Sequence, residues 1–262
     1  MSKSERIRAE ADRRFIDHVL HFTRVENLPG IVKEGLLSRT ELRARQLLAI
    51  GSSGQRWDGN DKAVSVSISR INRRMFKFKE TGLEEAGWVI LLLDRSILWT
   101  HDCNFFSENA STTRMKKRAR DGWLGEPAAF ERMFEDRTDG GGKSVRSKQG
   151  MPDDQPTDPG AEVQVLGPID PKLIVGAWVE RTELVERVRA DLSRLPQDPC
   201  VVRVAPFSGE CPFDNMQRLP SQAQREMARI YNEFSVDEHG SDAYLSDGVY
   251  ISPDGRLRGG RS

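Results

Sequence analysis

The sequence predicts an α+β fold, in which a sheet of short strands is flanked by helices. Short apolar or alternating runs with the period of a strand recur along most of the chain, and segments with helical spacing stand between them. At 262 residues the chain is long enough to bury a substantial core. We expect a main domain over residues 1–204 and a C-terminal extension over residues 205–262.

The N-terminal part predicts a helix, a strand and a second helix in succession. Residues 4–17 have apolar positions at helical spacing, residues 19–23 form a short apolar strand, and residues 25–34 return to a helical period. His21 and Thr23 alternate along the strand, so their side chains share one face. The helix that begins just beyond offers unpaired backbone N–H groups, which suit anions or sugar hydroxyls. From these residues alone, a buried structural histidine explains His21 equally well.

A polar, glycine-rich loop follows over residues 51–61 and carries Arg56 and Trp57, which a simple spacer does not need. Before it, Ser38 and Glu41 have the spacing of a capping box. After it, residues 63–69 alternate apolar side chains with serine, the pattern of a half-buried strand. Arg73 and Arg74 then stand among aromatic residues, which suits either a nucleic-acid edge or a solvated helix face, and we favour the solvated face.

The middle of the chain combines a buried strand with a basic cluster. Residues 88–94 predict a strand buried on both faces. We expect a loop over residues 99–111, in which Cys103 is a packed thiol. Residues 114–120 include five basic residues in seven. This cluster is typical of a solvated helix face, but it would also suit a phosphate-binding surface. Its candidate nucleic-acid contacts are Arg114, Lys116, Lys117 and Arg118.

The remaining elements are a helix over residues 126–135, a long polar loop over 137–160, a strand over 161–167, a strand over 173–179, a helix over 183–195 and a strand over 200–204. The strand over 161–167 places Glu162 and Gln164 on one face, because residues two apart share a face. The C-terminal extension predicts one helix, over residues 221–234, and a partly flexible end.

Composition excludes several classes of protein. The 40 basic and 40 acidic residues balance, so the overall charge says nothing about a nucleic-acid partner, and any such argument must come from local clusters. The three cysteines include no CxxC pair and the four histidines lack metal-ligand spacing, so we expect no metal site. No apolar run approaches the length of about 20 residues that a membrane helix needs. The charged N-terminus lacks a secretory signal, and we expect a cytoplasmic protein without a membrane partner.

Several strings, taken in order, resemble one family, the DarT-type ADP-ribosyltransferases. They are LHFTRVENLPGIVKEGL, RWDGNDKAVSVSIS with RRMF after it, WVILLLDRSILWTHDCNFFSENAS and PTDPGAEVQVLGPI, and they span roughly residues 18–180. These NAD-consuming toxins modify bases of single-stranded DNA. The resemblance implies an ADP-ribosyltransferase-like split mixed or antiparallel sheet with flanking helices and an NAD cleft, NAD as co-substrate and no metal.

The resemblance also implies a role for individual residues. His21 and Thr23 fall on the strand that holds NAD, with the backbone at Phe22 on the nicotinamide amide and Asn27 at the helix start that closes on the cofactor. Arg56 matches an arginine that engages the NAD phosphates and the incoming base, and it is therefore both a cofactor-binding and a catalytic candidate. Glu162 falls on the position of the catalytic glutamate. Residues 137–160 become the loop that recognises the acceptor.

The chemistry of the residues agrees with these roles. Breaking the bond from ribose to nicotinamide leaves a sugar cation similar to the oxocarbenium of glycoside hydrolysis. A carboxylate fixed beside the ribose stabilises that charge and can take a proton from the attacking base. One departure stands out: many superfamily members carry a stacking tyrosine on the second strand, where this chain has serines, so Phe22, Trp57 or Phe76 would supply the aromatic surface.

The resemblance therefore predicts an enzyme, a mono-ADP-ribosyltransferase that moves ADP-ribose from NAD to guanine or thymine in single-stranded DNA. It predicts the toxin of a toxin–antitoxin or phage-defence pair, with an antitoxin hydrolase as its partner. Two alternatives stay open. The acceptor could be RNA or protein, or the chain could be a catalytically silent NAD- or nucleic-acid-binding module.

Overall fold

The computed structural model describes residues 1–50, 56, 58–73, 75–76, 87–138, 142–197, 200–207, 243–244, 249–251 and 257–259. The chain divides into two units, Met1–Gly209 and Glu210–Ser262. The predicted helix over residues 221–234 and most of the basic segment after Arg73 lie outside the described residues.

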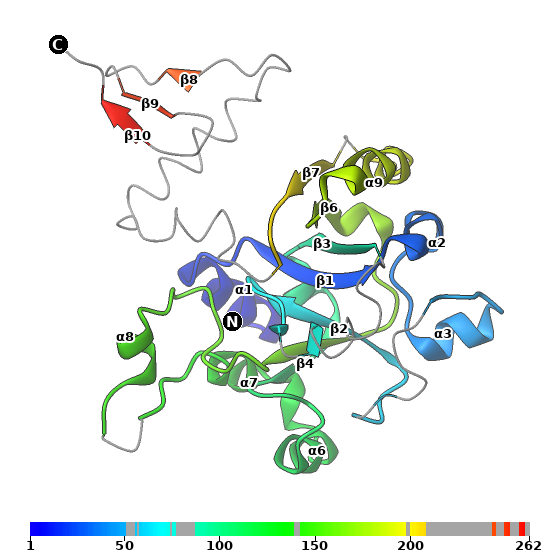
Figure 1. Ribbon diagram of the computed structural model, residues 1–262. Coiled ribbons are helices and arrows are strands. Elements are labelled where there is room, and N and C mark those ends of the chain that lie inside the picture. The colour runs from blue at the N-terminus through cyan, green and yellow to red at the C-terminus, as the bar shows by residue number, and fades with distance from the viewer. Residues whose placement is uncertain are drawn as a thin grey trace. The chain divides into compact units, whose positions relative to one another are not determined.

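The first unit is built on a mixed sheet with the strand order β4-β5-β2-β1-β3-β6-β7 (Figure 1). The neighbours pair antiparallel except β6 and β7, which run parallel. The strands are β1 (His18–Arg24), β2 (Ala63–Ile68), β3 (Trp88–Asp94), β4 (Asp102–Phe106), β5 (Glu162–Leu166), β6 (Ile174–Val179) and β7 (Val201–Val204). The α+β prediction with a mixed sheet is confirmed.

Helices surround this sheet (Figure 1). They are α1 (Lys3–Arg13), α2 (Leu28–Glu34), α3 (Arg39–Ala44), α5 (Ile97–Thr100), α6 (Thr113–Arg120), α7 (Pro127–Arg132), α8 (Val145–Gln149) and α9 (Val185–Leu192). Single 3₁₀ turns are η1 (Val25–Asn27), η2 (Trp123–Gly125), η3 (Pro171–Leu173) and η4 (Thr182–Leu184). The capping box predicted at Ser38 and Glu41 begins α3. In the described part of the chain, no helix is both long and apolar enough to cross a bilayer.

Strand periodicity explains the core. Six of the seven residues of β3 are buried, as expected for a central strand covered on both faces. β5 instead sends Val163 and Val165 into the main core cluster with Phe105. Because side chains alternate, Glu162 and Gln164 of β5 project from the opposite face. The core therefore fixes which face of the sheet carries the two polar residues.

The segment over residues 99–111 is not the loop that we predicted. It contains the end of α5 and the whole of β4, which pairs antiparallel with β5 from Asp102↔Leu166 to Phe106↔Glu162. Cys103 and Phe105 face the core, whereas Asp102 and Asn104 alternate with them. The dense mixture of polar and aromatic residues thus reflects an edge strand with one face in the main core, while its opposite face carries Asp102 and Asn104 together with Phe106, which is buried in a second, smaller cluster.

The second unit contains three described strands. They are β8 (Ala243–Tyr244), β9 (Val249–Ile251) and β10 (Leu257–Gly259), and they form an antiparallel sheet in the order β10-β9-β8.

Candidate active site

The predicted site residues converge where β1, β2 and β5 adjoin. β1 pairs with β3 along its whole length, and this register places His21 and Thr23 on one face, as predicted. Its ladder with β2 is confined to Val19↔Ile68 and Leu20↔Ser67. Beyond that point His21 Nδ1 lies 2.9 Å from the carbonyl oxygen of Ser65. The sheet thus splits at His21, and the imidazole bridges the two diverging strands.

The bond to Ser65 fixes how His21 is protonated. A carbonyl oxygen only accepts hydrogen bonds, so Nδ1 of His21 must carry the proton. In the neutral ring, Nε2 is then the hydrogen-bond acceptor. Nε2 can therefore accept a hydrogen bond from a hydroxyl group.

Arg56 is held by four hydrogen bonds to neighbouring groups. Its Nε and Nη2 atoms donate to the Asp58 carboxylate at 3.0 and 2.5 Å. Nη1 donates to the carbonyl oxygen of Ala63 at 2.7 Å, and Nη2 also donates to Ser65 Oγ at 2.7 Å. Because Ser65 contacts both Arg56 and His21, one residue of β2 links the predicted phosphate-binding arginine to the predicted ribose-binding histidine.

Asp58 and Gln164 complete a network that reaches Glu162. Gln164 Nε2 donates to Asp58 Oδ2 at 2.8 Å and to Glu162 Oε1 at 3.3 Å. The side-chain oxygen of Gln164 accepts from Asn60 Nδ2 at 2.8 Å. A continuous chain of hydrogen bonds therefore runs from His21 through Arg56 to Glu162. We did not single out Asp58 or Asn60 from the sequence.

Electrostatics keeps the Arg56–Asp58 pair ionised. Burial by itself would raise the pKa of Asp58, but the hydrogen bonds and positive charge of Arg56 outweigh it and lower that pKa. Burial likewise opposes the charge on Arg56, yet Asp58 and the nearby Glu162 raise the pKa of the guanidinium. The pair therefore stays charged across the physiological range although its two side chains are only 16% and 11% exposed.

The loop that carries Arg56 is anchored on two sides. Asp58 and Asn60 bond to Gln164 of β5, and the carbonyl oxygen of Asp61 accepts from the backbone and the hydroxyl of Thr40 in α3. The ion pair between Arg43 of α3 and the Asp61 carboxylate, at 2.8 Å, is exposed and adds little to this anchor, which rests on the backbone of Asp61. The capping box of α3 thus positions the helix that holds one end of this loop.

Asn27 stands at the start of α2, but its side chain makes no capping bond to that helix and holds a different segment of backbone. Its Nδ2 donates to Thr23 Oγ1 and to the carbonyl oxygen of Ile50, each at 3.1 Å. Its Oδ1 accepts from the backbone N–H of Ile50 at 2.8 Å. The amide therefore clamps the chain just before the glycine-rich loop onto the strand that carries His21.

Aromatic side chains cluster on the other face of β1. Phe22 makes edge-to-face contacts with Phe76 and Trp88, whose ring centroids lie 5.4 and 6.3 Å away. Phe76 is 4% exposed and also packs on Phe207, so its ring serves the core of this cluster. Trp57, the third aromatic candidate, lies outside the described residues.

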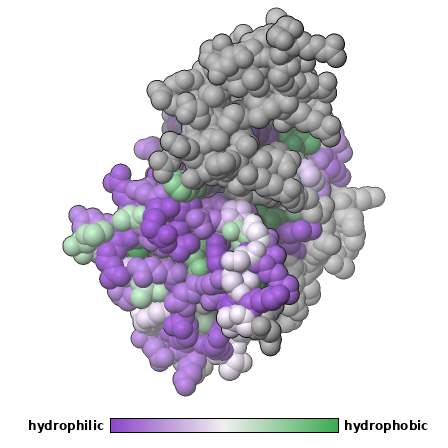
Figure 2. Space-filling model, turned by 90° about the vertical axis from the view of Figure 1, so that its left-hand side faces the viewer, coloured by the Kyte–Doolittle hydropathy of each residue, from purple (hydrophilic) through white to green (hydrophobic). Residues whose placement is uncertain are grey.

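Arginines fasten the long loop over residues 137–160. Arg146 at α8 donates to the carbonyl oxygens of Pro152 and Gln155 and to Thr157 Oγ1, at 2.7–2.9 Å. Arg70, which follows β2, donates to the carbonyl oxygen of Pro156 at 2.7 Å. The described part of the loop is therefore a built structure attached to the end of β2. Figure 2 shows the side of the molecule on which α8 lies in Figure 1, and most coloured residues there are hydrophilic.

The predicted basic cluster lies on α6, and its members have different environments. Arg114 pairs with Glu108 at 2.5 Å, and the Arg118 guanidinium lies 5.3 Å from the Trp123 ring centroid. Lys116 and Lys117 are exposed. Arg73, the other described candidate, is also exposed, whereas Arg74 lies outside the described residues.

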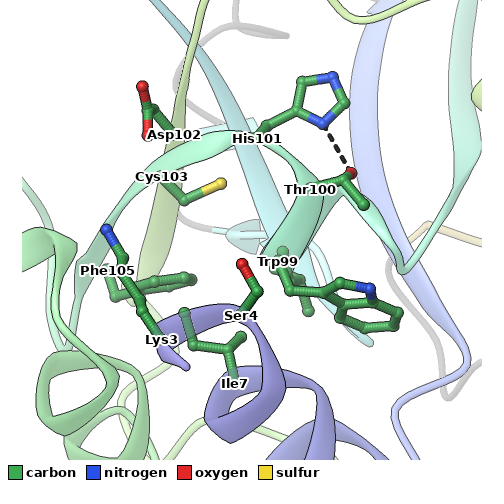
Figure 3. A pocket seen from close by; sticks show the side chains of 10 residues that line it. Lys3, Ser4, Ile7, Trp99, Thr100, His101, Asp102, Cys103 and Phe105 are labelled. Atoms are coloured by element: carbon green, nitrogen blue, oxygen red, sulfur yellow. Dashed lines mark hydrogen bonds between the residues drawn. The ribbon is translucent and has the colours of Figure 1, made fainter. Parts of the chain in front are cut away.

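A separate hollow lies between α1 and the α5–β4 corner (Figure 3). Its lining includes His101, which bonds to Thr100 Oγ1 at 2.9 Å, and Cys103, but none of the predicted site residues. Cys103 is 3% exposed, and burial raises the pKa of its thiol to about 12. The prediction of a packed thiol is confirmed. Among the described residues, no three His, Cys, Asp or Glu side chains gather to hold a metal ion.

Comparison with known proteins identifies a family. The model of the family described as DarT, the ssDNA thymidine ADP-ribosyltransferase, matches residues 20–210, well over half of the chain. A search of the curated proteins finds no match.

The fold is also similar to solved structures. Thermosipho africanus DarTG in complex with ADP-ribose is 14% identical, with a TM-score of 0.44 over 73% of this chain and 50% of that one. The chain thus spans about half the length of that protein. Thermus sp. 2.9 DarT in complex with carba-NAD+ is 15% identical, with a TM-score of 0.44 over 72% of this chain and 95% of that one. The same DarT in complex with ADP-ribosylated ssDNA is 14% identical, with a TM-score of 0.42 over 72% of this chain and 94% of that one.

Proposed function

The chain belongs to the DarT family of single-stranded-DNA ADP-ribosyltransferases, and from this premise we propose that it transfers ADP-ribose from NAD to a base of single-stranded DNA and releases nicotinamide. The observation that carries the proposal is the single network in which His21, Arg56 and Glu162 meet. The description of the family names thymidine, so thymine is the first acceptor base to test and guanine the second.

His21, Thr23, Asn27 and the backbone at Phe22 form the donor side of the proposed site. His21 presents an acceptor nitrogen for a ribose hydroxyl, because its other ring nitrogen donates to Ser65. Asn27 contributes indirectly, since its amide holds Ile50 and Thr23 together. Arg56 would bind a pyrophosphate oxygen through the one of its five N–H groups that remains after the four donated to described residues.

The catalytic residues of the proposal are Glu162, which acts on the reacting atoms as follows, and Arg56, which engages the incoming base. The bond between the ribose C1′ and the nicotinamide nitrogen breaks, its electron pair leaves with nicotinamide, and C1′ becomes positively charged. A fixed carboxylate stabilises this charge as it develops. A nitrogen or oxygen of the DNA base then forms the new bond to C1′ and gives up its proton, which Glu162 can accept. A single displacement of this kind inverts the configuration at C1′.

The acceptor side comprises the 137–160 loop and the basic residues of α6. The arginine contacts of the loop hold it in a defined shape, and a shaped surface can select one base. Lys116 and Lys117 are exposed and suit DNA phosphates, with Arg118, Arg114 and Arg73 as further candidates. Single-stranded DNA is the favoured substrate because a duplex hides its base edges, and opening it costs a few kcal/mol.

The proposal extends to a biological role. ADP-ribose on a base edge blocks pairing, so the product would arrest copying of the DNA. This suits the toxin of a toxin–antitoxin or phage-defence pair, with a hydrolase that removes ADP-ribose as the antitoxin partner.

The test supplies NAD that is labelled in its ADP-ribose part, together with equal amounts of single-stranded DNA, duplex DNA, RNA and cell protein. The proposal expects label on single-stranded DNA that disappears after nuclease treatment. Label that survives nuclease, or that enters RNA, would move the acceptor to protein or RNA. NAD binding without nicotinamide release would identify a silent binding module.

A further inference from the structure

Asp58 occupies the centre of the site although its role is not evident from its position in the sequence. Its Oδ1 accepts from Arg56 Nε at 3.0 Å and from the backbone N–H of Asn60 at 3.1 Å. Its Oδ2 accepts from Arg56 Nη2 at 2.5 Å and from Gln164 Nε2 at 2.8 Å. These four bonds use the full acceptor capacity of a carboxylate. We propose that Asp58 is a positioning residue that orients Glu162 through Gln164 and neutralises Arg56, an inference that rests on the proposed function.

Gln164 connects Asp58 to Glu162, because the side-chain amide of Gln164 can adopt only one of its two flipped orientations. Its oxygen accepts from Asn60 Nδ2, so its NH₂ group must face the two carboxylates of Asp58 and Glu162. The reversed amide would place an oxygen between two carboxylates and its NH₂ against the NH₂ of Asn60. Gln164 is 1% exposed, so no solvent competes for these bonds. Asp58 therefore fixes the position of the Gln164 NH₂ group, which donates a hydrogen bond to Glu162.

Neutralisation of Arg56 is the second part of the role. The ribose carbon becomes positive as nicotinamide leaves, so a nearby unpaired guanidinium would oppose the reaction. Asp58 takes both Nε and Nη2 of Arg56 in a bidentate ion pair, which is close to neutral as a unit. The ion pair with Asp58 therefore limits the attraction of Arg56 for the negative charge of Glu162. Without Asp58, Arg56 would be free to pair with Glu162 and mask it.

Asp58→Asn tests the role, and Asp61→Asn is its matched control. Both carboxylates lie in one loop, but Asp61 pairs with Arg43 and Arg39 of α3 and contacts neither Gln164 nor Glu162 by hydrogen bond in the described structure. In full-length protein supplied with NAD and single-stranded DNA, Asp58→Asn should lower the kcat for nicotinamide release at least 30-fold and change KM for NAD by less than threefold. Asp61→Asn should stay within threefold of wild type in both constants.

Gln164→Met supplies a second variant that keeps the Arg56–Asp58 pair and much of the packing volume. It should lower kcat about tenfold, and adding Asp58→Asn to it should cost much less than Asp58→Asn alone, because both act on Glu162 along one path. The inference is overturned if Asp58→Asn lowers kcat by the same factor in the wild type and in Gln164→Met. It is also overturned if the kcat of Asp58→Asn equals that of Asp61→Asn. If Asp58→Asn does not fold, the Gln164→Met result decides.

A spectroscopic readout separates this inference from the proposed function. In the nuclear magnetic resonance spectrum of the wild type and of Asp61→Asn, both side-chain NH₂ protons of Gln164 should be shifted downfield of the signals of a solvent-exposed glutamine and should exchange slowly. Asp58→Asn should move the signal of the proton that bonds to Asp58 towards the solvent-exposed value and speed its exchange. Unchanged Gln164 signals would overturn the positioning role whether or not the wild type modifies DNA, whereas failure of the wild type on DNA would concern only the proposed function.

Discussion

Arg56 and Asp58 form a bidentate ion pair at the centre of the site, with Nε–Oδ1 and Nη2–Oδ2 distances of 3.0 and 2.5 Å. The same guanidinium reaches Ala63 and Ser65 of β2, and the same carboxylate reaches Gln164 of β5. The pair thus fastens the loop that carries it to two neighbouring strands. It links the parts of the site that the proposal assigns to the donor and to catalysis.

Arg56→Lys should damage both folding and activity, because an ammonium group cannot reproduce the fork geometry of a guanidinium. We expect the free energy of unfolding to fall by about 2–3 kcal/mol, as several charged hydrogen bonds are lost from a mostly buried site. We expect ADP-ribose transfer to fall at least 100-fold. Denaturant unfolding and product formation measure the two effects. Arg43→Lys, in an exposed ion pair, is the control and should change neither; equal behaviour of the two variants would contradict the role of Arg56.

Asn27→Ala should release the backbone at Ile50. The N–H of Ile50 donates to Asn27 Oδ1 at 2.8 Å, so its exchange with deuterium should accelerate at least tenfold in the variant. The N–H of Leu42, which bonds to the carbonyl oxygen of Ser38 in α3, should exchange as in the wild type. If the exchange of Ile50 stays the same, the amide of Asn27 does not clamp this segment in solution.

The double variant Lys116→Gln with Lys117→Gln should weaken binding of single-stranded DNA and reduce its dependence on salt. Each lysine that contacts a phosphate contributes about 0.7 to the slope of log K against log salt concentration, so the slope should fall by about 1.4. Lys33→Gln with Lys172→Gln, on α2 and η3, removes the same charge elsewhere and should leave the slope unaltered. Identical slopes for all three proteins would show that α6 presents only a solvated face.

Cys103→Ala should change the dependence of stability on alkaline pH without loss of activity. Burial raises the pKa of the folded thiol to about 12, above its ordinary value of 9.0, so the unfolded chain loses this proton first as the pH rises. The stability of the wild type should therefore fall between about pH 9 and pH 12, by up to about 1.4 kcal/mol per pH unit from this group. The variant should lack that component in denaturant unfolding at successive pH values. A variant without transferase activity would instead identify Cys103 as functional.

Local patterns in the sequence were sufficient for much of the fold. The alternation of residues 161–167 placed Glu162 and Gln164 on one face, and the run over residues 88–94 identified the buried central strand. The missed strand β4 also alternates, since Cys103 and Phe105 face the core. Phe106 concealed that period, because it follows Phe105 directly and is also buried, which breaks the alternation of polar and apolar side chains.

The candidate site was less accessible to sequence reasoning. Without the family resemblance Glu162 would have been one strand glutamate among several, and Asp58 gave no signal of its own. Its bond to Gln164 joins residues that lie 106 positions apart, so only the pairing of β2 with β5 brings them together. Arg70, which follows β2, donates to the carbonyl oxygen of Pro156 in the 137–160 loop, a long-range contact that local pattern cannot reveal.

The most direct test of the account is mass spectrometry of short single-stranded oligonucleotides incubated with NAD and with either the wild type or Glu162→Gln. One oligonucleotide lacks guanine and the other lacks thymine. The account predicts that the wild type adds the mass of one ADP-ribose to one of them, the thymine-containing one being the first expectation, and that Glu162→Gln adds none. Unmodified oligonucleotides with the wild type, or equal modification by Glu162→Gln, would contradict it.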